Sequence, residues 1–131
     1  DRFKRINDCF GHAAGDEVIK TIGRLMREEL SALGTVARVG GEEFAFLSGD
    51  LGAADLRGRL LRFRERVAEE AVIFGGRRIQ ATVSAGMAAR TGGDFDGLYA
   101  AADKALYRAK AAGRDCVVDS DDVDDALQEA S

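Results

Sequence analysis

Residues 38–47 read RVGGEEFAFL, and this stretch organises the middle of the chain. A Gly-Gly pair between two apolar runs is a strong hairpin signal, because the central residues of the favoured two-residue turns need positive φ. We therefore predict a hairpin over residues 35–48, with its turn at Gly40 and Gly41. A turn does not require the adjacent carboxylates of Glu42 and Glu43, which repel one another, so this pair points to a function.

The composition is that of a single globular domain. The chain has 131 residues, of which 46% are hydrophobic and 32% are charged, and this length is enough for one core. No apolar run reaches the roughly 20 residues that span a bilayer, and no secretory signal is visible. Two cysteines outside any metal-ligand spacing, and a single histidine, argue against a disulfide framework, a histidine metal site and a Ser-His-Asp triad. We expect a reducing, cytoplasmic setting, no membrane contact, and only a structural bond from His12 to the backbone.

Charge is unevenly distributed along the sequence. Residues 119–131 contain 6 of the 23 acidic residues and no basic residue, which leaves 19 basic and 17 acidic residues in 1–118. We expect the acidic segment to be a disordered tail or a frayed helix outside a domain of residues 1–118. The nearly neutral domain argues against nucleic-acid binding, which needs a basic stripe, but it suits one small anionic ligand.

Hydrophobic periodicity predicts helices over residues 16–33, 53–71 and 95–112. Gly113 is the expected C-terminal stop of the last helix. Residues 72–88, VIFGGRRIQATVSAGMA, predict a short and a long strand joined at a second Gly-Gly pair, and RDCVV predicts a final short strand. This order indicates an α+β fold, with helices on one face of a mostly antiparallel sheet. A βαββαβ sheet has a central strand before its first helix, so we expect the sequence to be truncated upstream.

Three clusters of polar residues are candidates for a ligand site. In the first, the glycines of GGEE let a phosphate approach the backbone, because no Cβ blocks the way. The carboxylates of Glu42 and Glu43 suit Mg²⁺, a hard cation that takes oxygen ligands beside substrate phosphates. Taken alone, GGEE is explained at least as well by a solvated hairpin tip.

The second cluster lies in residues 3–16, FKRINDCFGHAAGD. We expect Lys4 and Arg5 in a glycine-containing loop ahead of a helix N-terminus, which favours anions. Asn7 and Asp16 together offer an amide and a carboxylate that are able to read the edge of a base. Taken alone, they are explained as a turn residue and a helix cap.

The third cluster is ADKALYRAKAAGRD, residues 102–115. Lys110 and Arg114 are four residues apart and are able to meet a phosphate chain together. The favourable dipole at a helix C-terminus explains cations there equally well.

Taken jointly, FKRIND, FGHAAGD, RVGGEEF, TVSAGMA and AADKALYRAKAAGRD closely resemble the motifs of the GGDEF family, the diguanylate cyclases, over residues 1 to about 118. The resemblance implies a palm-like βαββαβ fold of the nucleotidyl-cyclase type, with its first strand truncated here. It also implies an enzyme that condenses two GTP into cyclic di-GMP and two pyrophosphates, with Mg²⁺ or Mn²⁺. Each domain holds one GTP, so catalysis requires a two-fold homodimer. An upstream sensor domain is expected in the full-length protein.

The resemblance further implies roles for individual residues. Glu42 is a metal ligand, and Glu43 lies by the metals and is essential for catalysis. Gly40 and Gly41 form the turn on which the substrate lies. The residues implied to hold the guanine base are Asn7 and Asp16. Those implied to hold the triphosphate are Phe3 and Lys4, through main-chain amides, and Lys110 and Arg114.

Two departures from the family pattern are expected to matter. Asp1 matches the second aspartate of the family's DxDxFK, whereas the first, the other major metal ligand, would lie two residues upstream. A chain that truly began at Asp1 would show little or no catalysis. The product-binding RxxD motif is replaced by Ser31 and Gly34, so we expect no product inhibition there. The arginines of residues 57–66 are either a secondary site or a solvated face.

Two other functions stay open. One is a catalytically silent GTP-binding regulatory domain, against which the intact GGEEF at residues 40–44 argues. The other is a nucleotidyl cyclase or polymerase-like palm with a different product. Asn7 and Asp16 favour guanine over adenine, although similarity of fold alone does not decide between products.

Overall fold

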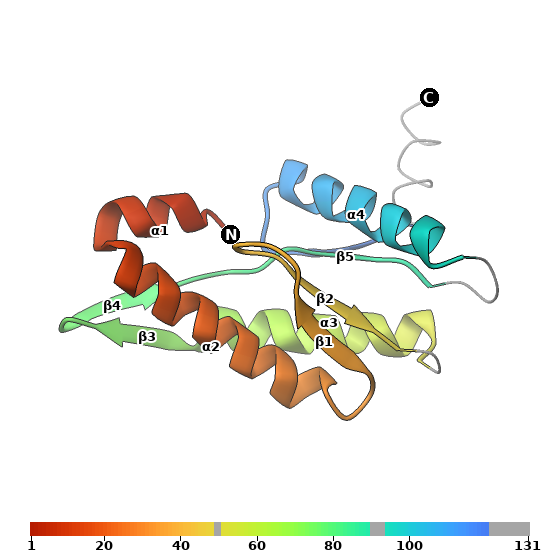
Figure 1. Ribbon diagram of the computed structural model, residues 1–131, viewed down its shortest axis with the longest axis horizontal. Coiled ribbons are helices and arrows are strands. Elements are labelled where there is room, and N and C mark those ends of the chain that lie inside the picture. Colours follow the sequence, from red (N-terminus) through yellow and green to blue (C-terminus); the bar gives the residue numbers. More distant parts are fainter. Residues whose placement is uncertain (49–50, 90–93, 121–131) are drawn as a thin grey trace. The chain divides into compact units, whose positions relative to one another are not determined.

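The structure is a computed structural model that describes residues 1–48, 51–89 and 94–120. Its elements in chain order (Figure 1) are α1 (Phe3–Phe10), α2 (His12–Leu30), β1 (Thr35–Arg38), β2 (Phe44–Leu47), α3 (Ala53–Glu69), β3 (Ala71–Phe74), β4 (Arg77–Gln80), β5 (Ala85–Met87), α4 (Phe95–Ala111) and β6 (Val117–Asp119). They form two compact units. The first comprises Asp1–Leu51 with Glu65–Ala81, and the second comprises Gly52–Arg64 with the described part of Thr82–Ser131.

Helix α2 supplies most of the core of the first unit. Its apolar side chains recur every three or four residues, so they share one face. The buried members are Ala14, Val18, Ile19, Ile22, Leu25, Met26 and Leu30. The helix contacts β1 and β3. The helix predicted over residues 16–33 is therefore confirmed, although it begins four residues earlier than expected, at His12, and ends at Leu30.

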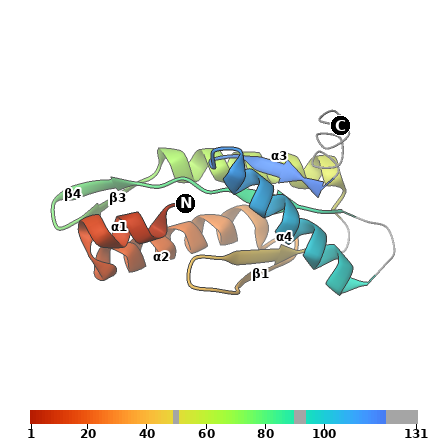
Figure 2. The same cartoon turned by 90° about the horizontal axis from the view of Figure 1, so that it is seen from above.

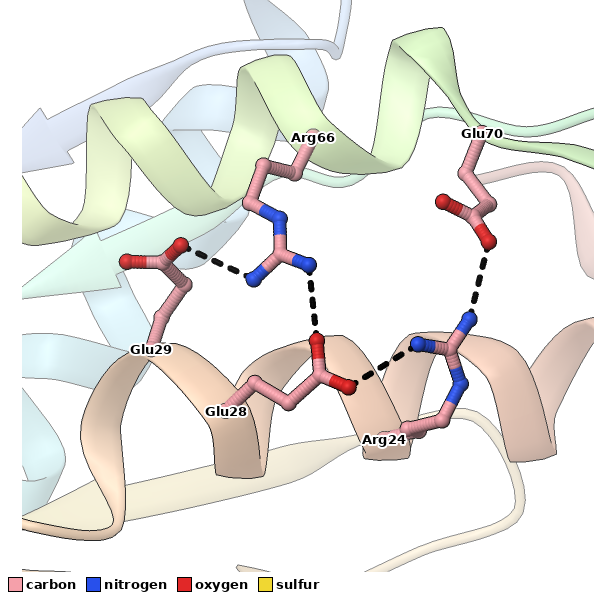
Figure 3. A network of polar contacts seen from close by, with 5 residues as sticks. All are labelled: Arg24, Glu28, Glu29, Arg66 and Glu70. Atoms are coloured by element: carbon pink, nitrogen blue, oxygen red, sulfur yellow. Dashed lines mark hydrogen bonds and ion pairs between the residues drawn. The ribbon is translucent and has the colours of Figure 1, made fainter.

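An ion-pair network joins α2 to the last turn of α3 and the residue after it (Figure 3). Arg24 donates to Glu28 at 3.0 Å and to Glu70 at 2.8 Å, and Arg66 donates to Glu28 at 2.7 Å and to Glu29 at 2.9 Å. These hydrogen bonds lower the pKa of Glu28, the bond from Arg66 contributing most and the bond from Arg24 next. The network thus fixes how the end of α3 meets α2 within this unit.

The predicted loop around Lys4 and Arg5 is wrong. Phe3–Phe10 form α1, and α2 already begins at His12. Gly11, with φ of 94°, allows the sharp change of direction between them, and α1 lies against the start of α2 (Figure 1). The Arg77 guanidinium carbon lies 4.5 Å from the centre of the Phe10 ring, a cation–π contact between β4 and α1.

Both predicted hairpins form, but their glycine pairs play different parts. β1 and β2 pair antiparallel, from Thr35↔Leu47 to Arg38↔Phe44, so five residues connect them. Neither Gly40 nor Gly41 has a positive φ, so the predicted two-residue turn is wrong at this position. Between β3 and β4, by contrast, Gly75 and Gly76 have φ of 58° and 77° and form the two-residue turn. The long strand expected after it is divided into β4 and β5.

The second unit is built on α4. β5 and β6 pair in parallel, as strands joined through a helix do, and α4 contacts both of them (Figure 2). The Asp94 side chain caps the helix by accepting a hydrogen bond from the Gly97 amide at 2.8 Å. At the other end Gly113, with φ of 114°, stops the helix as predicted. The Arg114 amide then donates to the carbonyl of Ala109, which completes a Schellman motif.

The α+β class is confirmed, whereas a single mostly antiparallel sheet is not formed by the described residues. Their strands pair two by two, and no described strand joins the β1–β2 and β3–β4 hairpins. β6 includes Asp119, the first residue of the predicted tail, and residues 121–131 lie outside the described residues. No helix within the described ranges is both long and apolar enough to cross a membrane.

Candidate functional site

An open pocket of about 630 Å³ lies in the first unit, between α1, the start of α2 and the loop that joins β1 to β2. Its lining residues are Phe3, Lys4, Asn7, Asp8, His12, Gly40, Gly41, Glu42 and Glu43. Seven of these nine are predicted site residues. The fold therefore brings the FKRIND and GGEE clusters, which are far apart in the sequence, to one place.

The first turn of α1 offers backbone donors to this pocket. The amides of Phe3 and Lys4 have no partner within the helix, because the first N–H groups of any helix lack one. Arg2, the residue before the helix, supplies no side-chain cap. Since the N-terminus of a helix also carries positive partial charge, these amides are suited to an anion such as a phosphate oxygen.

Asn7 lies one helical turn further along α1. Its Oδ1 is buried and has no hydrogen-bond partner among the described residues. The explanation of Asn7 as a turn residue is wrong, because it is inside a helix. Its side chain thus lines the pocket while its amide oxygen remains unsatisfied, which is uncommon for a buried polar atom.

Arg38, at the end of β1, holds the opposite wall of the pocket. Its Nε donates to the Gly40 carbonyl at 3.2 Å and its Nη2 donates to the Gly41 carbonyl at 2.6 Å. The loop is also closed by hydrogen bonds from the Val39 and Gly40 amides to the Glu43 carbonyl. An added Cβ at Gly41 would meet no atom within 4 Å, so the glycine borders open space where a ligand has room to approach.

The two carboxylates of this loop fit a magnesium ion that is shared with a ligand. Glu42 is exposed and Glu43 is half-buried, and both line the pocket. Within the described residues, no group of three or more His, Cys, Asp or Glu side chains is placed to hold a metal ion. Mg²⁺ is commonly held by one or two carboxylates together with substrate phosphates, and this donor set matches that arrangement.

Three predicted site residues are not among those that line the pocket. Asp16 is exposed on α2, and because that helix begins at His12, its explanation as a helix cap is wrong. Lys110 and Arg114 belong to the second unit. Lys110 lies in the last turn of α4, and Arg114 follows it with φ of 66°.

Arg64 holds the backbone that carries Arg114. Asp115, the next residue, also has a positive φ, of 49°, and two consecutive left-handed residues other than glycine are uncommon. The Arg64 Nη1 donates to the Asp115 carbonyl at 3.3 Å and to its Oδ1 at 3.0 Å. These bonds stabilise the unusual conformation at the end of α4.

The sequence prediction missed several residues of the site. Asp8 and His12 line the pocket, and His12 is exposed. Both belong to the motifs FKRIND and FGHAAGD, but the resemblance implied no role for either of them. The hydrogen bonds from Arg38 to the glycine loop are local, reaching carbonyls two and three residues away, but no sequence signal predicted them.

Comparison with known proteins identifies the family. Residues 1–116 match the family described as diguanylate cyclase, GGDEF domain. Diguanylate cyclase DgcP of Pseudomonas aeruginosa is 44% identical over 116 residues, which cover 88% of this chain and 17% of that protein. Diguanylate cyclase A of Treponema denticola is 35% identical over 122 residues, covering 89% of this chain and 32% of that protein. The chain thus spans less than a third of the length of these relatives.

Solved structures agree with this assignment. The GGDEF domain of DgcB from Caulobacter crescentus, in complex with c-di-GMP, has a TM-score of 0.88 at 31% identity, covering 92% of this chain and 73% of that one. The active GGEEF domain of a diguanylate cyclase from Vibrio cholerae has a TM-score of 0.82 at 32% identity, covering 92% and 77%. The fold is thus the palm-like fold of nucleotidyl cyclases. The chain belongs to the GGDEF family, whose named relatives are diguanylate cyclases.

Proposed function

We propose that this domain condenses two GTP into cyclic di-GMP and two pyrophosphates, as a two-fold dimer. The observation that carries the proposal is the pocket, which places free helix amides, the Asn7 amide and the Glu42 and Glu43 carboxylates around one open space. The GGEEF sequence of residues 40–44 supports it, because a domain with that signature is described as active in Vibrio cholerae.

In this proposal each contact follows from the chemistry of the residues. The Phe3 and Lys4 amides bind phosphate oxygens, and Asn7 binds the guanine base. Asp16 is proposed to bind the base together with Asn7, and it directly follows Gly15, the residue against which the Asn7 side chain lies. In the second unit, Lys110 and Arg114 are proposed to bind phosphate oxygens.

Glu42 and Glu43 are the residues that would hold Mg²⁺, or Mn²⁺ in its place. When bound, such a metal would lower the pKa of the attacking 3′-hydroxyl and neutralise charge on the leaving pyrophosphate. The 3′-hydroxyl of each GTP would attack the α-phosphate of the other, so each domain supplies half of the reactants. A homodimer is therefore part of the proposal, and so is an upstream sensor domain that controls it.

We also propose that feedback through the family's RxxD motif is absent. Position 31 is serine and position 34 is glycine. An added Cβ at Gly34 would overlap the Leu47 carbonyl oxygen and lie 2.9 Å from the Phe46 ring. Position 34 is thus both without a carboxylate and too crowded to take one while the hairpin keeps its place.

The test is GTP turnover with Mg²⁺, with the products identified by mass, on this chain and on the natural full-length protein. Cyclic di-GMP from either protein would support the proposal. Glu43→Gln is expected to abolish synthesis while GTP binding and dimerisation persist, and Glu65→Gln, the same change on the exposed side of α3, is expected to change nothing. GTP binding without any product would instead favour a silent regulatory domain, and a different cyclic product would overturn the assignment.

A further inference from the structure

Gly15 is a buried glycine in the first turn of α2, the helix that begins at His12. A Cβ added there would overlap Asn7 Oδ1 and would lie 3.0 Å from both Asn7 Cγ and Phe3 Cε2. The side chain of Asn7 therefore occupies the space that any side chain at position 15 would need. Contact between the two helices at this point depends on the missing Cβ.

Backbone conformation does not explain this glycine. Gly11 and Gly113 have positive φ, at which a side chain would be strained, but Gly15 is an ordinary helical residue. In a helix interior, glycine is less favourable than alanine because it has more conformational freedom to lose on folding. The contact with Asn7 is the feature of the structure that requires a glycine.

The Asn7 amide is unsatisfied where it meets α2. Its Oδ1 is buried without a hydrogen-bond partner among the described residues, although native proteins satisfy most such atoms. Asn7 is therefore held with its amide oxygen packed against Gly15 at the cost of a hydrogen bond, while the residue also lines the pocket.

We infer that Gly15 is a positioning residue, whose missing Cβ sets the Asn7 amide in the orientation that reads the guanine base. This inference rests on the proposed function. A side chain at position 15 would push Asn7 away from α2 and change its angle toward the base. The Phe3 and Lys4 amides, at the first turn of α1, would keep their access to phosphate.

Gly58 in α3 is a matched control, because an added Cβ there would meet nothing within 4 Å. Gly58→Ala is expected to raise the melting temperature by roughly 2–5 °C, as alanine favours a helix over glycine. Gly15→Ala is expected to lower it. In an Asn7→Ala background, the fall in melting temperature caused by Gly15→Ala is expected to be at most half as large, and the contact with Phe3 would account for the fall that remains. An equal loss in both backgrounds, or a rise like that of Gly58→Ala, would overturn the contact argument.

Binding measurements test the role in base recognition. Titration calorimetry with Mg²⁺ would compare GTP, ATP and inorganic tripolyphosphate on the wild type and on Gly15→Ala. Loss of one base hydrogen bond predicts about tenfold weaker GTP binding and a smaller preference for GTP over ATP, with tripolyphosphate binding unchanged. An unchanged preference, or an equal loss for GTP and tripolyphosphate, would overturn the positioning role. A wild type that binds no GTP would instead overturn the proposed function, and the melting experiment would still decide whether the contact exists.

Discussion

Replacing Gly86 with alanine is expected to separate β5 from α4. A Cβ at this position would overlap the Leu106 amide nitrogen and the Ala102 carbonyl oxygen, and it would lie 2.6 Å from Leu106 Cα. All three obstacles are main-chain atoms of α4, so no side-chain rotation relieves them. To move from 2.6 Å to an ordinary contact of at least 3.4 Å, the strand and the helix must part by at least 0.8 Å.

The cost of this movement follows from what the interface buries. Met87 is the next residue of β5, and Ala105 and Ala109 are on α4, and all three are at most 2% exposed. Overpacking a core costs typically about 1–3 kcal/mol, and an obstacle made of backbone places Gly86→Ala at the upper end. A loss of about 3 kcal/mol corresponds to a fall of roughly 10 °C in melting temperature for a domain of this size.

Urea and thermal unfolding, followed by circular dichroism, would measure this loss. Gly58→Ala serves as the control, since it adds the same methyl group to open space. If the free energy of unfolding of Gly86→Ala were within about 1 kcal/mol of that of the wild type, the argument for a main-chain contact between β5 and α4 would be refuted. Overpacking against main-chain atoms is expected to cost more than this, because no side chain is able to move aside.

Three further predictions concern single arginines and one glutamate. Arg38→Ala removes the two hydrogen bonds to the Gly40 and Gly41 carbonyls, so calorimetry with Mg²⁺ is expected to show severalfold weaker GTP binding. The control Arg59→Ala, on the exposed face of α3, is expected to leave GTP binding unchanged. Glu28→Gln is expected to destabilise the domain at neutral pH. Because folding lowers the pKa of Glu28, its ion pairs stabilise the fold above the ordinary pKa of 4.5, and this stabilisation is lost as pH falls through the lower pKa of the folded state. Urea titrations of the variant will therefore show a smaller loss of stability in acid than those of the wild type. Arg64→Ala removes the two hydrogen bonds that Arg64 donates to Asp115, the residue after Arg114, and is expected to weaken the binding of GTP and of tripolyphosphate equally. A change in the preference between GTP and ATP would contradict the role of Arg64 in holding the backbone of Arg114, which is proposed to bind phosphate.

The helices and hairpins that depend on periodic or turn signals were predictable from the sequence. α3 and α4 begin at the predicted residues, because their apolar positions recur over four turns or more. Seven of the nine pocket residues were also predicted, since the resemblance implies a role for each of them. Arg38 and Arg64 were not, because their partners are backbone carbonyls and a carboxylate whose positions only the folded chain defines.

Two identical dipeptides show the limit of local sequence signals. Gly75 and Gly76 have the positive φ that a two-residue turn demands, whereas Gly40 and Gly41 do not. In the β1–β2 loop, the turn is made by five residues and is held by Arg38. The hairpin rule therefore predicted the right element there for the wrong reason, and the glycines of the signature are better explained by the room they leave beside the pocket.

The helical state of Phe3–Phe10 changes how the site is understood. A run of only eight residues that ends at Gly11 gives a weak periodic signal, so a loop was the natural prediction. As a helix, it places Asn7 four residues after Phe3 on the same face, about 6 Å further along the axis. The residues proposed to contact the phosphate and the base thus lie on one helix, so the distance between them is fixed before the ligand binds. This preorganisation reduces the entropy lost on binding. It follows that affinity depends on the contacts that hold α1, namely Gly15 beneath Asn7 and Arg77 over Phe10, as well as on the residues that touch the nucleotide.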